Sequence, residues 1–160
     1  MSLLILTTGG TIDKLYFDAL SEYQIGDSVV DRILRTARVA VPFRVQEVMR
    51  KDSLEIDDAD RAAIAAAVRA ADEPRIVITH GTDTMTETAK ALGDVGGKTV
   101  VLVGALAPAR FAESDATFNL GMAVAASQVA GPGVWIAMNG TIFDGLRVRK
   151  DRAINSFVAA

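Results

Sequence analysis

Apolar residues along this chain are gathered in short runs that alternate with longer stretches of mixed polarity. The runs are rich in Val, Ile and Leu, and they cover 2–8, 42–49, 74–80, 98–104 and 133–139. Three of these five runs are apolar almost throughout instead of alternating, which is typical of strands buried on both faces of a parallel sheet. We therefore predict a strand at each run.

The stretches between the runs carry the spacing of helices. Helices are predicted over 27–38, 57–72, 82–93 and 116–131. The clearest begins at Asp57, a favourable N-cap residue, and places Ile64 and Val68 four positions apart among strong helix formers. Strands that alternate with helices predict an α/β fold, here a single domain over 1–160 with a three-layer, open and mostly parallel sheet of five strands.

A hairpin is predicted after the last of these strands. Residues 141–150 have the sequence TIFDGLRVRK and contain Asp144-Gly145, a pair that tolerates the positive φ angles of a tight turn. This turn would present Lys150 from the second arm of the hairpin.

The composition excludes several kinds of site. The 160 residues include no cysteine, so disulfides, thiolate nucleophiles and cysteine-ligated metals are excluded. A single histidine, His80, is too few for a His-rich zinc site and is more typical of a buried structural residue. The net charge of −3 argues against a nucleic-acid partner or an anionic membrane surface. We expect a small-molecule substrate, no metal and no cofactor.

Hydropathy leads to an expectation about location. The apolar segment Leu3–Leu6 is too short for a signal peptide and follows no basic segment, and no run approaches the length of a membrane span. We therefore expect a cytoplasmic protein with no membrane partner.

Two loops rich in hydroxyl groups and glycine follow predicted strands. One covers 8–13, and the other is THGTDT at 79–84. Ligands of open α/β sheets bind at the carboxyl ends of strands, where glycines let several N–H groups face an anion. A nucleotide is not favoured, because the first loop lacks the G-x-G-x-x-G spacing. The segment GGKT at 96–99 is no phosphate loop either, since the required first glycine is replaced by Leu92.

Four segments, in this order, resemble the successive signatures of the bacterial-type L-asparaginase family. They are TTGGTIDK, VITHGTDTMTETA, VVLVGALAPARFAESDATFNL and MNGTIFDGLRVRK, and together they extend across nearly the whole chain. The resemblance implies the fold of the N-terminal domain of L-asparaginases. It also implies an amidohydrolase that converts L-asparagine to L-aspartate and ammonia.

The resemblance assigns roles to particular residues. By position in the motifs, Thr11 corresponds to the family's nucleophile and Tyr23 to a tyrosine on a mobile loop that assists it. Thr82, Asp83 and Lys150 correspond to the family's second group of threonine, aspartate and lysine.

These residue types suit the hydrolysis of an amide. A threonine hydroxyl is a poor nucleophile until a base accepts its proton, and Lys150 can be that base through Thr82. Asp83 can hold the ammonium group of an amino-acid substrate. Attack would release ammonia and leave an acyl ester on Thr11, which water then hydrolyses. Backbone N–H groups near three residues could stabilise the oxyanion. These are Gly10, Gly81 and Ala105.

The segment MRKDS at 49–53 departs from the family pattern. The family commonly has a small hydroxyl residue and a polar partner here, which bind the α-carboxylate of the substrate. Asp52 fits this pattern, whereas Arg50 and Lys51 replace neutral groups with cations. We expect these cations to pair with the α-carboxylate by charge-assisted hydrogen bonds.

Family members usually carry a second, C-terminal domain that helps close the site of a neighbouring subunit. This sequence has no segment that matches it and resembles a short-chain form. We therefore expect a homo-oligomer, a dimer or a tetramer, in which a neighbouring copy covers the catalytic loops. Phe111 and Phe118 are candidates for that contact, and they are equally compatible with a core position.

Other interpretations of the same residues are open. A threonine beside glycine at a strand end is often a turn or cap residue, Tyr23 could pack a loop, and Lys150 stands in the charged run RVRKDR. Two alternative functions follow. One is a non-catalytic module that binds amino acids or regulates; the other is an amidohydrolase for glutamine or a modified amide.

Overall fold

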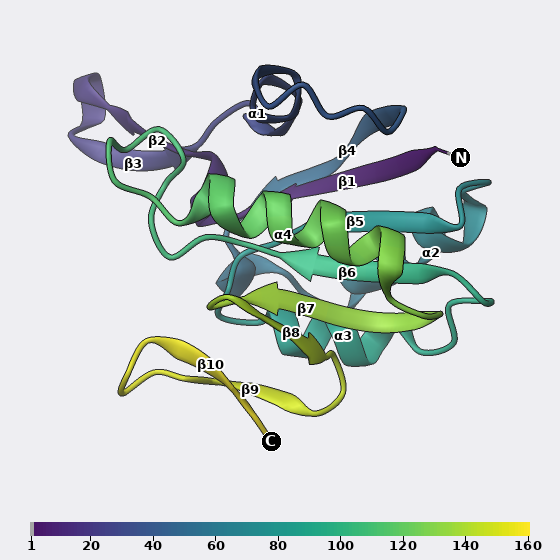
Figure 1. Cartoon of the computed structure of the whole chain (residues 1–160). Coiled ribbons are helices and arrows are strands. Elements are labelled where there is room, and N and C mark those ends of the chain that lie inside the picture. Colours follow the sequence, from purple (N-terminus) through teal and green to yellow (C-terminus); the bar gives the residue numbers. More distant parts are fainter. Residues whose placement is uncertain (1) are drawn as a thin grey trace.

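The central sheet of the computed structural model, which describes residues 2–160, contains six strands in the order β4-β1-β5-β6-β7-β8 (Figure 1). Their bounds are β1 Leu3–Gly9, β4 Phe43–Lys51, β5 Arg75–Thr79, β6 Thr99–Val103, β7 Gly133–Met138 and β8 Thr141–Asp144. All neighbouring pairs run parallel except β7 and β8. The predicted α/β class with a mostly parallel sheet is confirmed, with one strand more than the five expected.

Helices cover both faces of this sheet. The four helices are α1 Val30–Thr36, α2 Asp58–Ala70, α3 Met85–Leu92 and α4 Ala116–Val129. In Figure 1, α4 crosses in front of the sheet, while α2 and α3 lie behind it. The alternation along β1 divides the core accordingly, because Leu3 and Ile5 pack with α1 and α4 whereas Leu4 and Leu6 pack with α2 and α3. This gives the three layers expected.

Two helices begin at different points than the pattern predicted. Asp57 is the N-cap of α2, and its carboxylate accepts the N–H of Asp60 at 2.8 Å in a capping box, as its position suggested. The helix predicted from Thr82 begins only at Met85, and the three preceding residues form a loop. The helix predicted over 27–38 is limited to Val30–Thr36.

The hairpin predicted over 141–150 is wrong. Strand β8 pairs with β7 instead, through a two-residue turn at Asn139 and Gly140 with φ angles of 53° and 68°. Asparagine and glycine are the residues that adopt this left-handed conformation most readily, so they set the turn. Lys150 lies on β9 Val148–Asp151, which forms a separate hairpin with β10 Ser156–Ala159. The turn at Asp144-Gly145 therefore connects strands of two different sheets.

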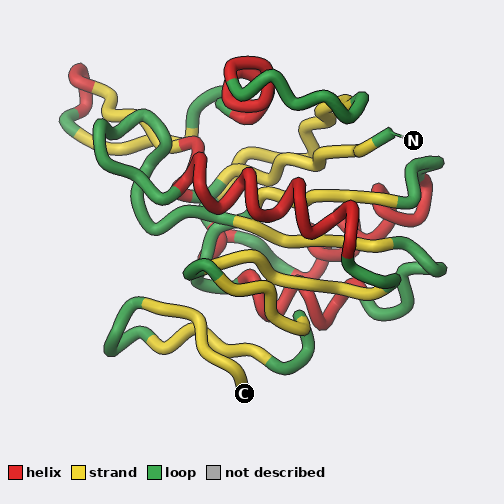
Figure 2. The backbone as a smooth tube through the Cα atoms, in the orientation of Figure 1, coloured by secondary structure: helices red, strands yellow, loops and turns green. Residues whose placement is uncertain are grey.

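A second small hairpin, which no periodicity predicted, follows β1. It consists of β2 Lys14–Phe17 and β3 Glu22–Ile25, and it projects from the end of the sheet where the parallel strands finish (Figures 1 and 2). Short 3-10 turns lie beside it at Thr11–Asp13, Asp18–Leu20 and Ser53–Glu55. Its strands lack an alternating pattern because most of their side chains are exposed on both faces.

The helices of residues 2–160 are all too short or too polar to cross a membrane. The longest, α4, has 14 residues.

Candidate active site

The predicted catalytic loops lie together at the carboxyl ends of three adjacent strands. Strand β1 lies between β4 and β5 in the sheet, although β4 precedes β5 in the chain. The chain therefore leaves β1 toward β4 on one side and leaves the adjacent β5 toward β6 on the other, which creates the crevice where α/β proteins bind ligands. Thr11 follows β1, Ser53 follows β4, and Thr82 follows β5.

Glycines bring these three loops into backbone contact. A Cβ atom on Gly10, whose φ is +86°, would lie 2.5 Å from the backbone nitrogen of Gly81. A Cβ atom on Gly81 would lie 2.6 Å from the Cβ atom of Ser53. Real side chains do not fit at such distances, so both positions require glycine. Since Thr11 and Thr82 directly follow these glycines, the packing places the two threonines on touching loops.

Lys150 joins the second threonine from a distant part of the chain. Its Nζ lies 2.7 Å from Oγ1 of Thr82 and 2.9 Å from Oδ1 of Asp83. The Lys150 side chain is only 12% exposed, and Thr82 is buried. Arg152 Nη2 lies 3.8 Å from the same Asp83 oxygen. The structure thus brings together the three residues Thr82, Asp83 and Lys150 that the sequence singled out.

Two neighbouring cavities open at this site. The larger, which we call the polar cleft, has a volume of about 700 Å³. Its lining includes Lys14, Tyr23, Arg50, Asp52, Glu55 and Asp83. The smaller, which we call the threonine pocket, has a volume of about 340 Å³ and is lined by Thr11, Lys14, Tyr23, Leu106, Pro108 and Phe111. Because Lys14 and Tyr23 line both, the two cavities meet at these side chains.

Tyr23 reaches the site from the exposed hairpin β2–β3. Its ring centroid lies 5.4 Å from that of Tyr16 and 5.9 Å from that of Phe111. Both pairs are tilted, which is an arrangement that aromatic rings prefer. Tyr23 is 54% exposed and still lines both cavities. The aromatic neighbours therefore hold its ring at the mouth of the site rather than in the core.

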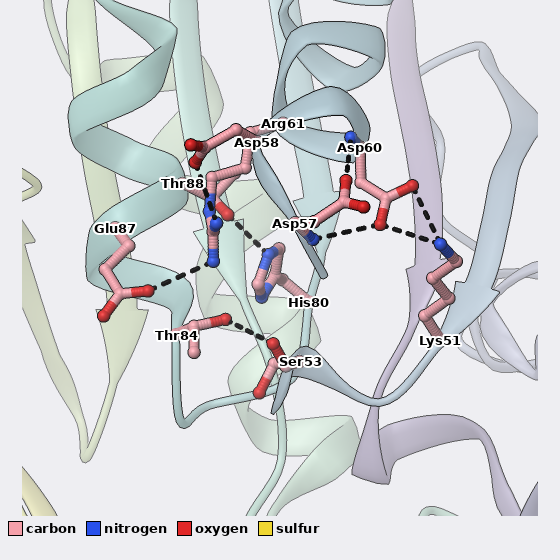
Figure 3. A network of polar contacts seen from close by, with 10 residues as sticks. All are labelled: Lys51, Ser53, Asp57, Asp58, Asp60, Arg61, His80, Thr84, Glu87 and Thr88. Atoms are coloured by element: carbon pink, nitrogen blue, oxygen red, sulfur yellow. Dashed lines mark hydrogen bonds and ion pairs between the residues drawn. The ribbon is translucent and has the colours of Figure 1, made fainter. Parts of the chain in front are cut away.

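The three residues predicted to bind the substrate carboxylate lie in different surroundings. The structure brings Lys51 to Asp60, with Nζ 2.8 and 3.0 Å from the two carboxylate oxygens, and Figure 3 shows the lysine pointing to this aspartate. Lys51 is not among the residues that line either cavity. Arg50 does line the polar cleft, but its guanidinium binds Glu47 at 2.7 Å and Asp27 at 2.6 Å.

Asp52 lies in the polar cleft and is fixed from two sides. Its Oδ1 accepts the N–H of Leu54 at 3.1 Å, and its Oδ2 lies 3.1 Å from Nζ of Lys14. Partial burial acts to raise the pKa of Asp52, but the Leu54 N–H and the Lys14 ammonium outweigh it and lower the pKa from its usual value. Asp52 is therefore held as a carboxylate.

The predicted oxyanion donors need one correction. The N–H of Gly10 donates to the carbonyl of Lys51 at 3.0 Å, so this donor is already used and does not face a substrate. Beyond Ala105, the N–H groups of Leu106 and Ala107 donate to the carboxylate of Asp115 at 2.9 to 3.1 Å. These bonds fix the loop that carries Ala105.

His80 lies buried behind the site and supports the second loop. Its Nδ1 is 2.7 Å from the carbonyl oxygen of Gly81, so Nδ1 carries the proton, and Nε2 accepts the hydroxyl of Thr88 at 2.7 Å. Figure 3 shows the contact between Thr88 and this ring. Burial lowers the pKa of His80 to about 4, which keeps the ring neutral near neutral pH. This agrees with the structural role predicted for it.

No local pattern of the sequence indicates the residues that hold the base of the β2–β3 hairpin. Asp13 is buried, and its Oδ1 accepts the N–H of Val29 at 3.0 Å. The Arg110 guanidinium donates to the carbonyls of Asp13 and Asp27, each at 2.8 Å. Burial raises the pKa of Asp13 to about 6. Local patterns cannot show these contacts, since they join three separate segments.

A metal site is not evident. Among the side chains that the structure describes, no three of His, Cys, Asp or Glu lie together in a way that could hold a metal ion.

Known proteins resemble this chain along nearly its whole length. Residues 2–157 match the family described as Asparaginase, N-terminal. The chain is 35% identical to the L-asparaginase of Thermococcus kodakarensis over 94% of its length, and 32% identical to a glutaminase-asparaginase of Pseudomonas fluorescens over 93%. The solved structure of the thermostable Thermococcus kodakarensis L-asparaginase superimposes on 99% of the chain with a TM-score of 0.88 and 32% identity.

The match covers only part of these relatives. The chain spans 48% of the Thermococcus L-asparaginase, 45% of the Pseudomonas protein and 51% of the solved structure. It thus spans about half the length of the curated relatives it matches.

Proposed function

The chain belongs to the Asparaginase, N-terminal family, and from this we propose that it hydrolyses the side-chain amide of L-asparagine to L-aspartate and ammonia. The observation that carries the proposal is the position of Lys150, whose Nζ lies 2.7 Å from Thr82 and 2.9 Å from Asp83 at the end of β5. A lysine, a hydroxyl and a carboxylate in contact beside a second threonine supply the base, the relay and the ammonium ligand that amide hydrolysis needs.

The first half of the reaction transfers the acyl group to Thr11. The hydroxyl oxygen of Thr11 attacks the amide carbon, and its proton passes through Thr82 to Nζ of Lys150, which acts as the base. Tyr23, at the mouth of both cavities, assists this transfer. When the C–N bond breaks, the nitrogen takes this proton back from Lys150 and leaves as ammonia. The acyl group remains on Thr11 as an ester.

The second half returns the enzyme to its starting state. A water molecule attacks the ester carbon, and its proton goes to the same base. The C–O bond to Thr11 then breaks to release aspartate, and the base returns the proton to the Thr11 oxygen. The N–H groups at Gly81 and Ala105 are the proposed donors to the oxyanion of both steps, since the N–H of Gly10 already donates to the carbonyl of Lys51. Asp83 binds the substrate ammonium in both halves.

Glutamine is the second candidate substrate. One relative that the chain matches over 93% of its length carries the name glutaminase-asparaginase. Glutamine is longer by a single methylene group, a difference that an open cleft of about 700 Å³ accommodates. Discrimination between the two amides is therefore expected to be modest.

We also propose that copies of the chain associate beside the site. The support is the exposure of large apolar side chains, of which Tyr16 and Phe111 contact Tyr23 at the site and Phe118 lies on α4. A second copy over this surface would exclude water from the catalytic loops and strengthen their electrostatic effects.

A cytoplasmic location stays a prediction from the sequence.

Ammonia release from a panel of L-asparagine, L-glutamine and their D-enantiomers tests the proposed activity. We expect turnover of L-asparagine, with Thr11→Ala reducing kcat by about 10²-fold or more because the nucleophile acts in the transition state. Thr141→Ala, an exposed threonine on β8, is the matched control and should retain full activity. If the purified chain binds L-aspartate but releases no ammonia from any amide, it is a binding module and the hydrolase proposal fails.

A further inference from the structure

Lys14 has a position that neither the motifs nor the family match assign. It begins β2, three residues after Thr11, and it lines both the polar cleft and the threonine pocket. Two other lysines in this region already have close partners. Lys150 binds Thr82 and Asp83, and Lys51 binds Asp60. We infer that Lys14, held in place by Asp52, binds the α-carboxylate of the amino-acid substrate.

The pair formed by Lys14 and Asp52 is well fixed. Their charged atoms are 3.1 Å apart, and the side chains are 28% and 30% exposed. Asp52 is itself anchored by the N–H of Leu54, so the position of its carboxylate follows from the turn after β4. Lys14 therefore presents its ammonium at a defined place where the two cavities meet.

The ammonium retains hydrogen-bonding capacity in this arrangement. A lysine ammonium has three N–H donors, and the contact with Asp52 uses one of them. A substrate carboxylate that reaches the remaining donors forms a charge-assisted hydrogen bond, which is stronger than one between neutral groups. Arg50 is a poorer candidate, because its guanidinium already binds both Glu47 and Asp27.

The charges around Lys14 set the orientation of the substrate. The polar cleft is lined by three carboxylates, Asp52, Glu55 and Asp83, which repel an anion and attract a cation. The threonine pocket has Lys14 as its charged residue and contains Thr11. An α-amino acid amide fits this pattern when its ammonium faces Asp83, its carboxylate faces Lys14 and its amide reaches Thr11.

This inference rests on the proposed function and makes Lys14 a residue that determines specificity. The site should prefer amides that carry an adjacent carboxylate over equally small amides that do not. The suitable pair of compounds is L-asparagine and 3-aminopropanamide, which is asparagine without its α-carboxylate. A purely structural Lys14–Asp52 pair would affect both compounds alike.

Steady-state kinetics of Lys14→Met with both compounds test the inference. We expect KM for L-asparagine to rise about tenfold or more, with kcat changed far less and KM for 3-aminopropanamide unchanged. Lys14→Arg should restore much of the affinity, and Lys90→Met is the matched control, since this lysine is exposed on α3 and lines neither cavity. Equal changes for both compounds, or no change for either, would overturn the inference.

Binding of L-aspartate, followed by calorimetry, separates this inference from the proposed hydrolysis. The product carries the same α-carboxylate and needs no turnover, so Lys14→Met should weaken its binding about tenfold or more. Weakened binding in a chain without ammonia release would uphold Lys14 and reject the hydrolase. Turnover with unaltered aspartate binding, or no aspartate binding by the wild type, would reject Lys14. Lys14→Gln replaces Lys14→Met if circular dichroism shows that the methionine variant is unfolded.

Discussion

The Nζ atom of Lys150 lies 2.7 Å from Oγ1 of Thr82, although 68 positions separate the two residues in the chain. Lys150 comes from β9, which belongs to a two-stranded sheet outside the main one, whereas Thr82 follows the central strand β5. The small β9–β10 hairpin thus brings an amine to the loop after β5, although β6 and β7 lie between β5 and β8 in the main sheet.

This contact predicts a shared role of the two residues in catalysis. Thr82→Val and Lys150→Met should each lower kcat by about 10²-fold, and the double variant should be little worse than either single one, since both act in one proton relay. Ammonia release at saturating L-asparagine measures this effect. Arg149→Met, the neighbouring and more exposed position on β9, should have near wild-type kcat. Full additivity of the two single effects would show that the residues act independently.

Arg110 is predicted to hold the β2–β3 hairpin over the site. Its guanidinium joins the carbonyls of Asp13 and Asp27 on the two sides of the hairpin base, at 2.8 Å each. Arg110→Met should therefore speed hydrogen exchange of the amides in 14–25 and raise KM, because Lys14 and Tyr23 are displaced. Arg147→Met, an exposed arginine far from the hairpin, is the control. Unchanged exchange in 14–25 would contradict the prediction.

The pH dependence of stability should reveal the buried carboxyl of Asp13. Its pKa is raised from 3.8 to about 6 in the folded protein, so the fold favours the protonated form. The stability that this provides is fully present below the unfolded pKa and is lost as the pH rises through about 6. Asp13→Asn stays neutral and keeps an acceptor for the N–H of Val29, so it should lack this loss.

Urea unfolding of the wild type and of Asp13→Asn at several pH values measures the effect. The unfolding free energy of the wild type relative to the variant should fall by roughly 2 to 3 kcal/mol between pH 4 and pH 7. His80, whose pKa is lowered to about 4, contributes in the opposite direction, but it is common to both proteins and cancels in the difference. A difference that does not vary with pH would mean that Asp13 is not titrated in this range.

Self-association is predicted to follow the exposed apolar surface near the site. The sedimentation coefficient and the specific activity, measured over a dilution series, should decline together, since a separated copy exposes the catalytic loops to water. Phe118→Ser, on the exposed face of α4, should shift both curves to higher concentration without touching Tyr23. A fully active monomer at low concentration would refute the association and leave the β2–β3 hairpin to close the site alone.

The sequence by itself determined the layered core and the location of the chemistry. The apolar runs at β1, β5 and β6 predicted buried strands, and Asp57 predicted the start of α2. Both signals are local, because they depend only on neighbouring residues along the chain and their contact with solvent. The motifs around Thr11 and Thr82 placed two hydroxyl loops at strand ends. The resemblance to L-asparaginases selected Lys150 from a run of charged residues.

Only the tertiary structure decided which partners the charged side chains take. The sequence does not distinguish Lys51 from Lys14. In the structure, Lys51 pairs with Asp60 at the start of α2, whereas Lys14 pairs with Asp52 at the mouth of the site. Asp13 is buried, and Arg110 donates to two backbone carbonyls, because segments that are distant in the chain meet in the fold. Electrostatic pairing and burial depend on distances between remote residues, so no local pattern of the chain contains them.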